Sequence, residues 1–105
     1  MKPLTDISPA PNALYRELID AFIAGLPAWM SGVRTAHAQQ DWPELARAAH
    51  DMKGMGGGFG YPRLTELAAT MEQAIKSKNW DAVADYASEL GRLVAGITAR
   101  ANLDI

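Results

Sequence analysis

A helical spacing of apolar residues, interrupted at only a few positions, constrains the fold of this chain most. Leu14, Leu18 and Phe22 recur at intervals of four residues. Leu67 and Met71 repeat the same spacing later in the chain. Alanine and leucine dominate the apolar residues, and runs of β-branched residues, which strands favour, are missing. The sequence therefore predicts an all-α protein.

Helix-breaking residues divide this periodic pattern into five predicted helical segments. Prolines make residues 1–11 a flexible, extended lead-in, which leaves residues 12–105 as one helical domain. A first segment, about 12–24, is expected to end at Gly25, and Pro27 suits the first turn of a second segment. Short connections between amphipathic segments favour an antiparallel helical bundle.

The third, fourth and fifth segments have clearer end signals. Asp41, followed by Glu44, is an acidic version of the capping box that begins many helices. Gly60 is a favoured helix stop, and Pro62 fits the first turn of the next helix. Asn79 is the expected N-cap of the last segment. The third helix is thus expected to run from Asp41 to Gly60, with its glycines inside the helix.

Charge and composition exclude several classes of function. A formal net charge of -2 gives no electrostatic reason to expect nucleic acid or an anionic membrane as a partner. No apolar run approaches the ~18–20 residues that cross a bilayer, and the N-terminus lacks the apolar stretch of a signal peptide. Because the chain has no cysteine for disulfides or thiolate metal sites, we expect it in the reducing cytoplasm.

One face of the third segment is cleared of side chains around a histidine. On a helical wheel Leu45 lies on the apolar side, and His50 lies almost opposite. The neighbours of this histidine at i−4, i+4 and i+7 are Ala46, Gly54 and Gly57. Glycine costs about 1 kcal/mol relative to alanine inside a helix, so these glycines need a compensating role. We expect them to let a bulky partner reach the imidazole.

The residues beside His50 favour phosphoryl chemistry. A neutral imidazole is a nucleophile, and Lys53 places a cation one turn away, with Arg47 on the other side. Two cations can balance the charge of a phosphoryl group. Proton transfer is the weaker alternative, because no carboxylate is placed to orient the ring and Asp51 points elsewhere on the helix. Neither a Walker loop nor a dinucleotide fingerprint fits the glycine pattern.

The segment "AHDMKGMGGGFG", from Ala49 to Gly60, resembles the H-x-x-K-G motif of histidine-containing phosphotransfer (HPt) domains. The resemblance implies an antiparallel up-and-down four-helix bundle with an additional N-terminal helical segment. It implies that His50 is phosphorylated, that Lys53 assists the phosphoryl group and that Gly54 gives access. Gly57 falls where the family has small residues, whereas Arg47 and Ala46 enter the expected docking surface from the helical wheel alone.

The same resemblance implies what the chain works with. Its expected partners are response-regulator receiver domains and a sensor or hybrid histidine kinase, between which it relays phosphate as a monomeric carrier rather than as an enzyme. It is expected to have no ATP site and no cofactor or metal of its own, because Mg²⁺ belongs to the acidic pocket of the receiver. Two alternatives stay open: a phosphotransfer module of a larger chemotaxis-type or hybrid kinase, and a helical adaptor that is never phosphorylated. Met1 and the apparent completeness of the bundle favour a stand-alone protein.

The remaining histidine and the tryptophans are interpreted as structural residues. His37 is expected to be a surface or half-buried structural histidine, and Trp29, Trp42 and Trp80 are expected to pack in the core or at helix ends. The sequence assigns no role to Gly58. The pathway, the particular receivers and the direction of net phosphate flow lie beyond what one sequence reveals.

Overall fold

The computed structural model describes the backbone of residues 9–103 and the side chains of residues 14–101. Within these residues the chain forms four α-helices and one short 3-10 helix, and it forms no strand. The elements are α2 (Pro9–Ala38), α3 (Trp42–Met55), η1 (Gly57–Phe59), α4 (Pro62–Lys76) and α5 (Trp80–Leu103). The prediction of an all-α protein is therefore confirmed.

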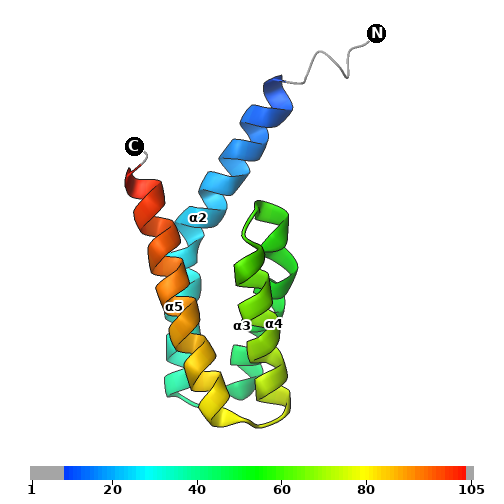
Figure 1. The fold of residues 1–105 in the computed structure, drawn as a ribbon, viewed down its shortest axis with the longest axis vertical. Helices are drawn as coiled ribbons and strands as arrows, with labels where there is room; N and C mark the ends of the chain where they lie inside the picture. Colours follow the sequence, from blue (N-terminus) through cyan, green and yellow to red (C-terminus); the bar gives the residue numbers. More distant parts are fainter. Residues whose placement is uncertain (1–8, 104–105) are drawn as a thin grey trace.

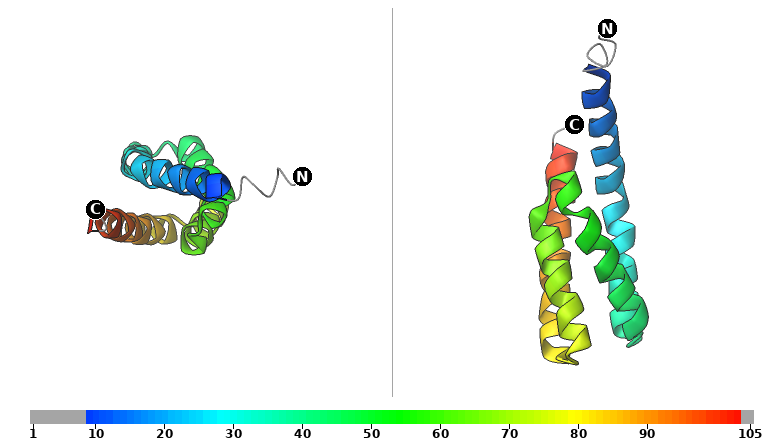
Figure 2. Two further views of the ribbon diagram at one scale, coloured as in Figure 1. Left: turned by 90° about the horizontal axis from the view of Figure 1, so that it is seen from above. Right: turned by 90° about the vertical axis from the view of Figure 1, so that its right-hand side faces the viewer.

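The four α-helices run up and down in chain order (Figure 1). α3 packs against α4, α4 packs against α5, and α2 closes the ring through contacts with both α5 and α3. The view from above in Figure 2 shows the helices arranged around a common centre. This is the antiparallel four-helix bundle that the sequence predicts.

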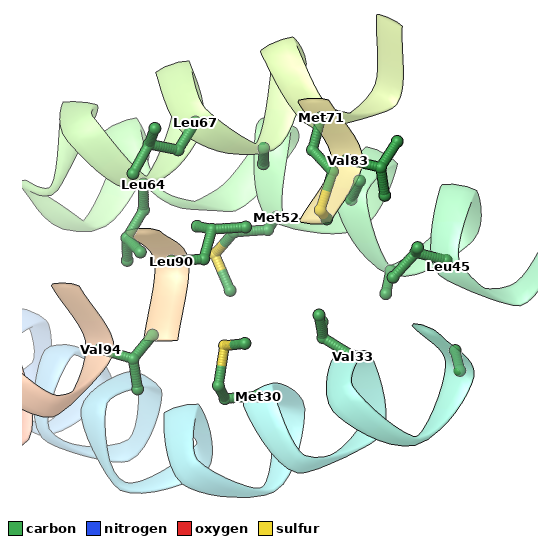
Figure 3. Close-up of a cluster of buried hydrophobic side chains, with 14 of the residues drawn as sticks. Met30, Val33, Leu45, Met52, Leu64, Leu67, Met71, Val83, Leu90 and Val94 are labelled. Atoms are coloured by element: carbon green, nitrogen blue, oxygen red, sulfur yellow. The ribbon is translucent and has the colours of Figure 1, made fainter. Parts of the chain in front are cut away.

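The apolar stripes of the four helices meet in one core (Figure 3). Each fully buried side chain of this kind contributes about 1.5–3 kcal/mol relative to its exposure to water. The largest of them are Leu26, Met30, Val33, Leu45, Met52, Leu64, Met71, Val83 and Leu90. Because all four helices contribute, the core fixes the register in which α3 and α4 face each other.

α2 is one uninterrupted helix, so the predicted break at Gly25 and Pro27 is wrong. A proline inside a helix removes one hydrogen bond and crowds the carbonyl four residues earlier. Leu26 and Met30 are both buried, and Pro27 itself faces solvent, so core packing on either side of the proline holds the helix together. The additional N-terminal segment is therefore the first part of α2. Of the lead-in, residues 9–11 belong to this helix, and residues 1–8 lie outside the described residues.

The two connections at the lower end in Figure 1 are short turns with side-chain caps. Asp41 accepts a hydrogen bond from the N–H of Glu44 at 3.2 Å, and Asn79 accepts one from the N–H of Ala82 at 3.3 Å. Each cap satisfies one of the N–H groups that a helix start leaves without a partner. Both predicted N-caps are confirmed.

Residues 39–42 and 77–80, which form these two turns, are named the closed end. Gln40 and Lys78 stand at the matching position of each turn with φ of 56° and 58°. The rings of Trp42 and Trp80, at the starts of α3 and α5, stack with centroids 4.2 Å apart. This stack joins the two turns, as expected of tryptophans at helix ends.

The connection between α3 and α4 lies at the other end of the bundle and is named the glycine turn, residues 56–60. α3 ends at Met55 and gives way to η1, so the prediction that regular helix continues to Gly60 is wrong. Gly60 has φ of 91°, a left-handed conformation that glycine adopts without strain. Phe59 stacks on Phe22 of α2 at 4.6 Å, which fastens the turn to the rest of the bundle.

Candidate functional site

His50 stands on the solvent side of α3, as the helical wheel predicts. Its side chain is 65% exposed. The residues that α3 buries are Leu45, Ala48, Ala49 and Met52. The imidazole is therefore accessible to a large partner, and the helix that carries it is fixed by its opposite face.

A carboxylate from α4, Glu72, holds both His50 and Lys53. One oxygen, Oε2, lies 3.2 Å from Nδ1 of His50, and the other, Oε1, accepts a hydrogen bond from Nζ of Lys53 at 2.8 Å. The Glu72 side chain is only 8% exposed, whereas that of Lys53 is 39% exposed. The expectation that no carboxylate orients the ring is therefore wrong.

The sequence contains a pattern that could have marked Glu72 as a site residue. It follows Ala68 by one helical turn, and Ala68 belongs to the apolar stripe of α4. An acid at a buried position of a stripe is unusual unless it is paired, because desolvation of a charge is costly. That pattern marks Glu72 as a candidate, but its partner becomes visible only when α3 and α4 are packed together.

The environment of Glu72 keeps its carboxyl group ionised. The hydrogen bond from Lys53 lowers its pKa below the ordinary value, burial acts in the opposite direction, and the hydrogen bond with His50 lowers the pKa further. Lys76, with Nζ 3.9 Å from Oε2, adds a weaker attraction of the same sign. The carboxylate thus stays an acceptor for both of its partners at neutral pH.

This contact decides which nitrogen of His50 faces outward. An ionised carboxylate can only accept, so Nδ1 must carry the proton in the contact with Glu72. In the neutral ring the lone pair then lies on Nε2, the nitrogen on the far side from Glu72. The site therefore offers one exposed, oriented nucleophilic nitrogen beside one ammonium group.

Three glycines near His50 differ in their surroundings. Gly54, one turn after the histidine, has open space where a Cβ would lie, in agreement with a role in access. Gly57 belongs to η1 and not to the wheel of α3, and a Cβ there would lie 3.6 Å from Oγ1 of Thr65. Gly58, unassigned from the sequence, accepts a hydrogen bond through its carbonyl from the hydroxyl of Tyr15 at 3.1 Å.

Arg47 and Ala46 lie on α3 within one turn of His50. The guanidinium of Arg47 pairs with Glu44 and, at 2.9 Å, with Asp51. The hydrogen bond with Glu44 raises the pKa of Arg47, so this cation stays charged and is directed along the outer face of α3. Ala46 is half-buried against the core. The guanidinium of Arg47 is thus paired with two carboxylates of its own helix.

The other predicted features fall away from the site. His37 is half-buried, and its ring centroid lies 6.1 Å from that of Trp42 in a tilted arrangement, which fits the structural role expected of it. Among the described residues no group of three or more His, Cys, Asp or Glu side chains could hold a metal ion. No helix in the described part of the chain is long and apolar enough to span a membrane.

A known protein family matches most of the chain. The family model of the Hpt domain matches residues 17–100, a range that includes all of α3 and α4 and most of α2 and α5. No curated protein and no solved structure matches the chain. The chain therefore belongs to the Hpt domain family, whose members carry out histidine phosphotransfer in the phosphorelays of two-component signalling.

Proposed function

We propose that this chain relays a phosphoryl group between receiver aspartates through a phosphohistidine at His50. One observation carries the proposal: the Nδ1 side of an imidazole that is 65% exposed is held by a buried carboxylate at 3.2 Å. The ring is therefore pre-oriented with Nε2 toward solvent, which is the geometry an attacking nitrogen needs.

The chemical step follows from this orientation. The lone pair of Nε2 attacks the phosphorus of an aspartyl phosphate, and the bond between phosphorus and the aspartate oxygen breaks. The aspartate leaves as a carboxylate with the bonding electron pair, and the proton on Nδ1 stays in place. The ring gains positive charge as the new bond forms, and the anionic Glu72 beside Nδ1 stabilises that charge. Transfer to a second receiver is the reverse reaction.

Lys53 is proposed to accompany the phosphoryl group during transfer. Its ammonium lies on the same carboxylate as the ring, so it stands beside the histidine before any partner arrives. Its partial exposure lets it turn toward an incoming phosphoryl oxygen, while Lys76 remains near Glu72. The cation then offsets the charge spread over the transferred group.

The receiver is proposed to dock over the outer face of α3 and the neighbouring part of α2. Gly54 leaves space beside the histidine. Leu14, Leu18 and Met55 are large apolar side chains with 57%, 49% and 40% of their surface exposed. Exposed apolar side chains of this kind are typical of protein interfaces. Mg²⁺ is supplied by the acidic pocket of the receiver, and the chain itself contributes no cofactor.

The test is phosphate uptake from a receiver domain charged on its aspartate. Wild type should acquire phosphate that is labile to acid and stable to base, the behaviour of phosphohistidine. His50→Gln should acquire none, and His37→Gln should behave as wild type, because it removes the other histidine of the chain. If wild type binds receivers of its host but takes up no phosphate from any of them, the adaptor alternative replaces the relay.

A further inference from the structure

The hydroxyl of Thr65, in the first turn of α4, is inserted into the backbone hydrogen bonds of α3. In a continuous α-helix the N–H of Gly57 would donate to the carbonyl of Lys53, four residues earlier. Here that N–H donates to Oγ1 of Thr65 at 2.7 Å, and the same hydroxyl donates to the carbonyl of Lys53 at 3.1 Å. The hydroxyl thus stands between two groups that would otherwise bond to each other.

This insertion coincides with the end of α3. The N–H of Gly56 still donates to the carbonyl of Met52 at 2.9 Å, the last regular bond of the helix. The next bonds are of the tighter 3-10 kind, from Phe59 to Gly56 and from Gly60 to Gly57. A side chain that enters the ladder of a helix bends or ends it. The Thr65 hydroxyl therefore stands where the regular helix stops, two residues after Lys53.

Gly56 makes this approach possible. A Cβ at position 56 would lie 2.9 Å from both the backbone nitrogen and the hydroxyl of Thr65. Any side chain at Gly56 would therefore push α4 away from the end of α3. The space that the Thr65 hydroxyl needs therefore explains why the buried residue at position 56 is a glycine.

Lys53 is consequently held at both of its ends by α4. Thr65 binds its carbonyl, and Glu72 binds its ammonium. Thr65 and Glu72 are separated by seven residues, two helical turns, and so lie on one stripe of α4 that faces α3. Before a partner arrives, the backbone and the ammonium of the lysine are thereby both bound to the same helix.

We propose that Thr65 is a positioning residue for phosphoryl transfer, which acts by fixing Lys53 beside His50. The proposal rests on the proposed function. Loss of the hydroxyl frees the Lys53 carbonyl and the Gly57 N–H to bond to each other, which extends α3 and rotates the backbone that carries Lys53. The ammonium then meets the incoming phosphoryl group in the wrong place.

The test compares rates of phosphate transfer from a charged receiver to the full chain. Thr65→Val should slow transfer roughly tenfold or more, since a misplacement of about 1 Å can cost ~100-fold. Thr65→Ser keeps the hydroxyl and should restore the rate. The matched control is Thr70→Val, because Thr70 lies on the same helix and its hydroxyl bonds only to the carbonyl of Glu66. If Thr65→Val does not fold, Thr65→Ala removes the same hydroxyl with less bulk and replaces it.

A second comparison separates positioning from a general structural role. In a Lys53→Met background, Thr65→Val should slow transfer no further, because the residue through which it acts is already gone. An equal slowing with and without Lys53, or a wild-type rate in Thr65→Val, would overturn the positioning role. A wild-type chain that accepts no phosphate from any receiver would instead overturn the proposed function itself.

Discussion

The two ends of the bundle are closed in opposite ways. At the closed end two similar turns carry capping side chains, and the stacked rings of Trp42 and Trp80 fill the space between them. At the glycine turn side chains are largely missing, and a hydroxyl from α4 enters the backbone of α3. Capping and aromatic side chains stabilise the closed end, whereas the glycine turn takes its shape from the absence of side chains at its glycines.

The difference shows which end of the bundle leaves space for a partner. Capped helix ends and aromatic stacks stabilise a bundle. Glycine weakens a helix, yet it lets α4 approach the end of α3 and leaves the surface beside His50 open. The predicted effects of substitution at the two ends should differ accordingly.

The largest effect on stability is expected from Gly56→Ala. The new methyl group would lie 2.9 Å from the backbone of Thr65, so α3 and α4 must separate locally, and overpacking of this kind costs about 1–3 kcal/mol. Urea unfolding measures the change. Gly58→Ala is the matched control: its Cβ would meet nothing within 4 Å, and its stability should stay within about 0.5 kcal/mol of wild type. Equal losses in the two variants would contradict the close approach of Thr65.

The closed end is tested by Trp80→Ala. Removal of this ring, which is 38% exposed, ends the stack with Trp42 and should cost about 1–2 kcal/mol of unfolding free energy. Phosphate transfer to His50 should keep its wild-type rate in the folded variant, measured well below the unfolding midpoint. A large loss of transfer rate would show that the two ends are not functionally separate.

A smaller effect with a defined pH dependence is expected from Glu72→Gln. The folded-state pKa of Glu72 lies below its ordinary value of 4.5, chiefly because of Lys53, so the ionised carboxylate stabilises the folded chain above that value. At neutral pH the unfolding free energy of wild type should exceed that of the variant by about 1 kcal/mol. This difference should shrink as the pH falls below 4.5 and vanish below the folded-state pKa of Glu72. Urea midpoints from about pH 7 to about pH 3 follow the difference. A difference that does not change with pH would exclude ionisation of Glu72 as its source.

The smallest effect on stability is expected from Gly54→Leu. Its side chain would enter open solvent on a helix, so stability should rise by about 0.5 kcal/mol or stay unchanged. Transfer of phosphate from a receiver should nevertheless become slower, because the leucine occupies the space beside His50. Gly54→Ala controls for helix propensity and should retain most of the rate. Unchanged transfer in Gly54→Leu would contradict the role of this glycine in access.

Local signals predicted much of this molecule because each lies within a few residues of chain. The caps at Asp41 and Asn79 are carried by side chains that bond three residues ahead. His50 and Lys53 lie one turn apart on the same helix, so their placement on neighbouring parts of its surface follows from helical geometry alone.

The features that the sequence did not predict depend on contacts between helices. Glu72 and Thr65 meet α3 across the bundle, and their partners depend on the register in which α3 and α4 pack. Local preference predicts a break at Pro27, but burial of Leu26 and Met30 outweighs that preference. The early end of α3 likewise follows from a hydroxyl of another helix.

The continuity of α2 has a mechanical consequence. With 30 residues it forms a rod about 45 Å long. Tyr15 and Phe22, in its first half, contact the glycine turn, and near its end the ring of His37 lies 6.1 Å from that of Trp42. α2 continues without a break between these contacts, so we expect the bundle to meet successive partners as one stiff body. Little conformational entropy is then lost at each encounter, which suits a carrier that must bind and release quickly.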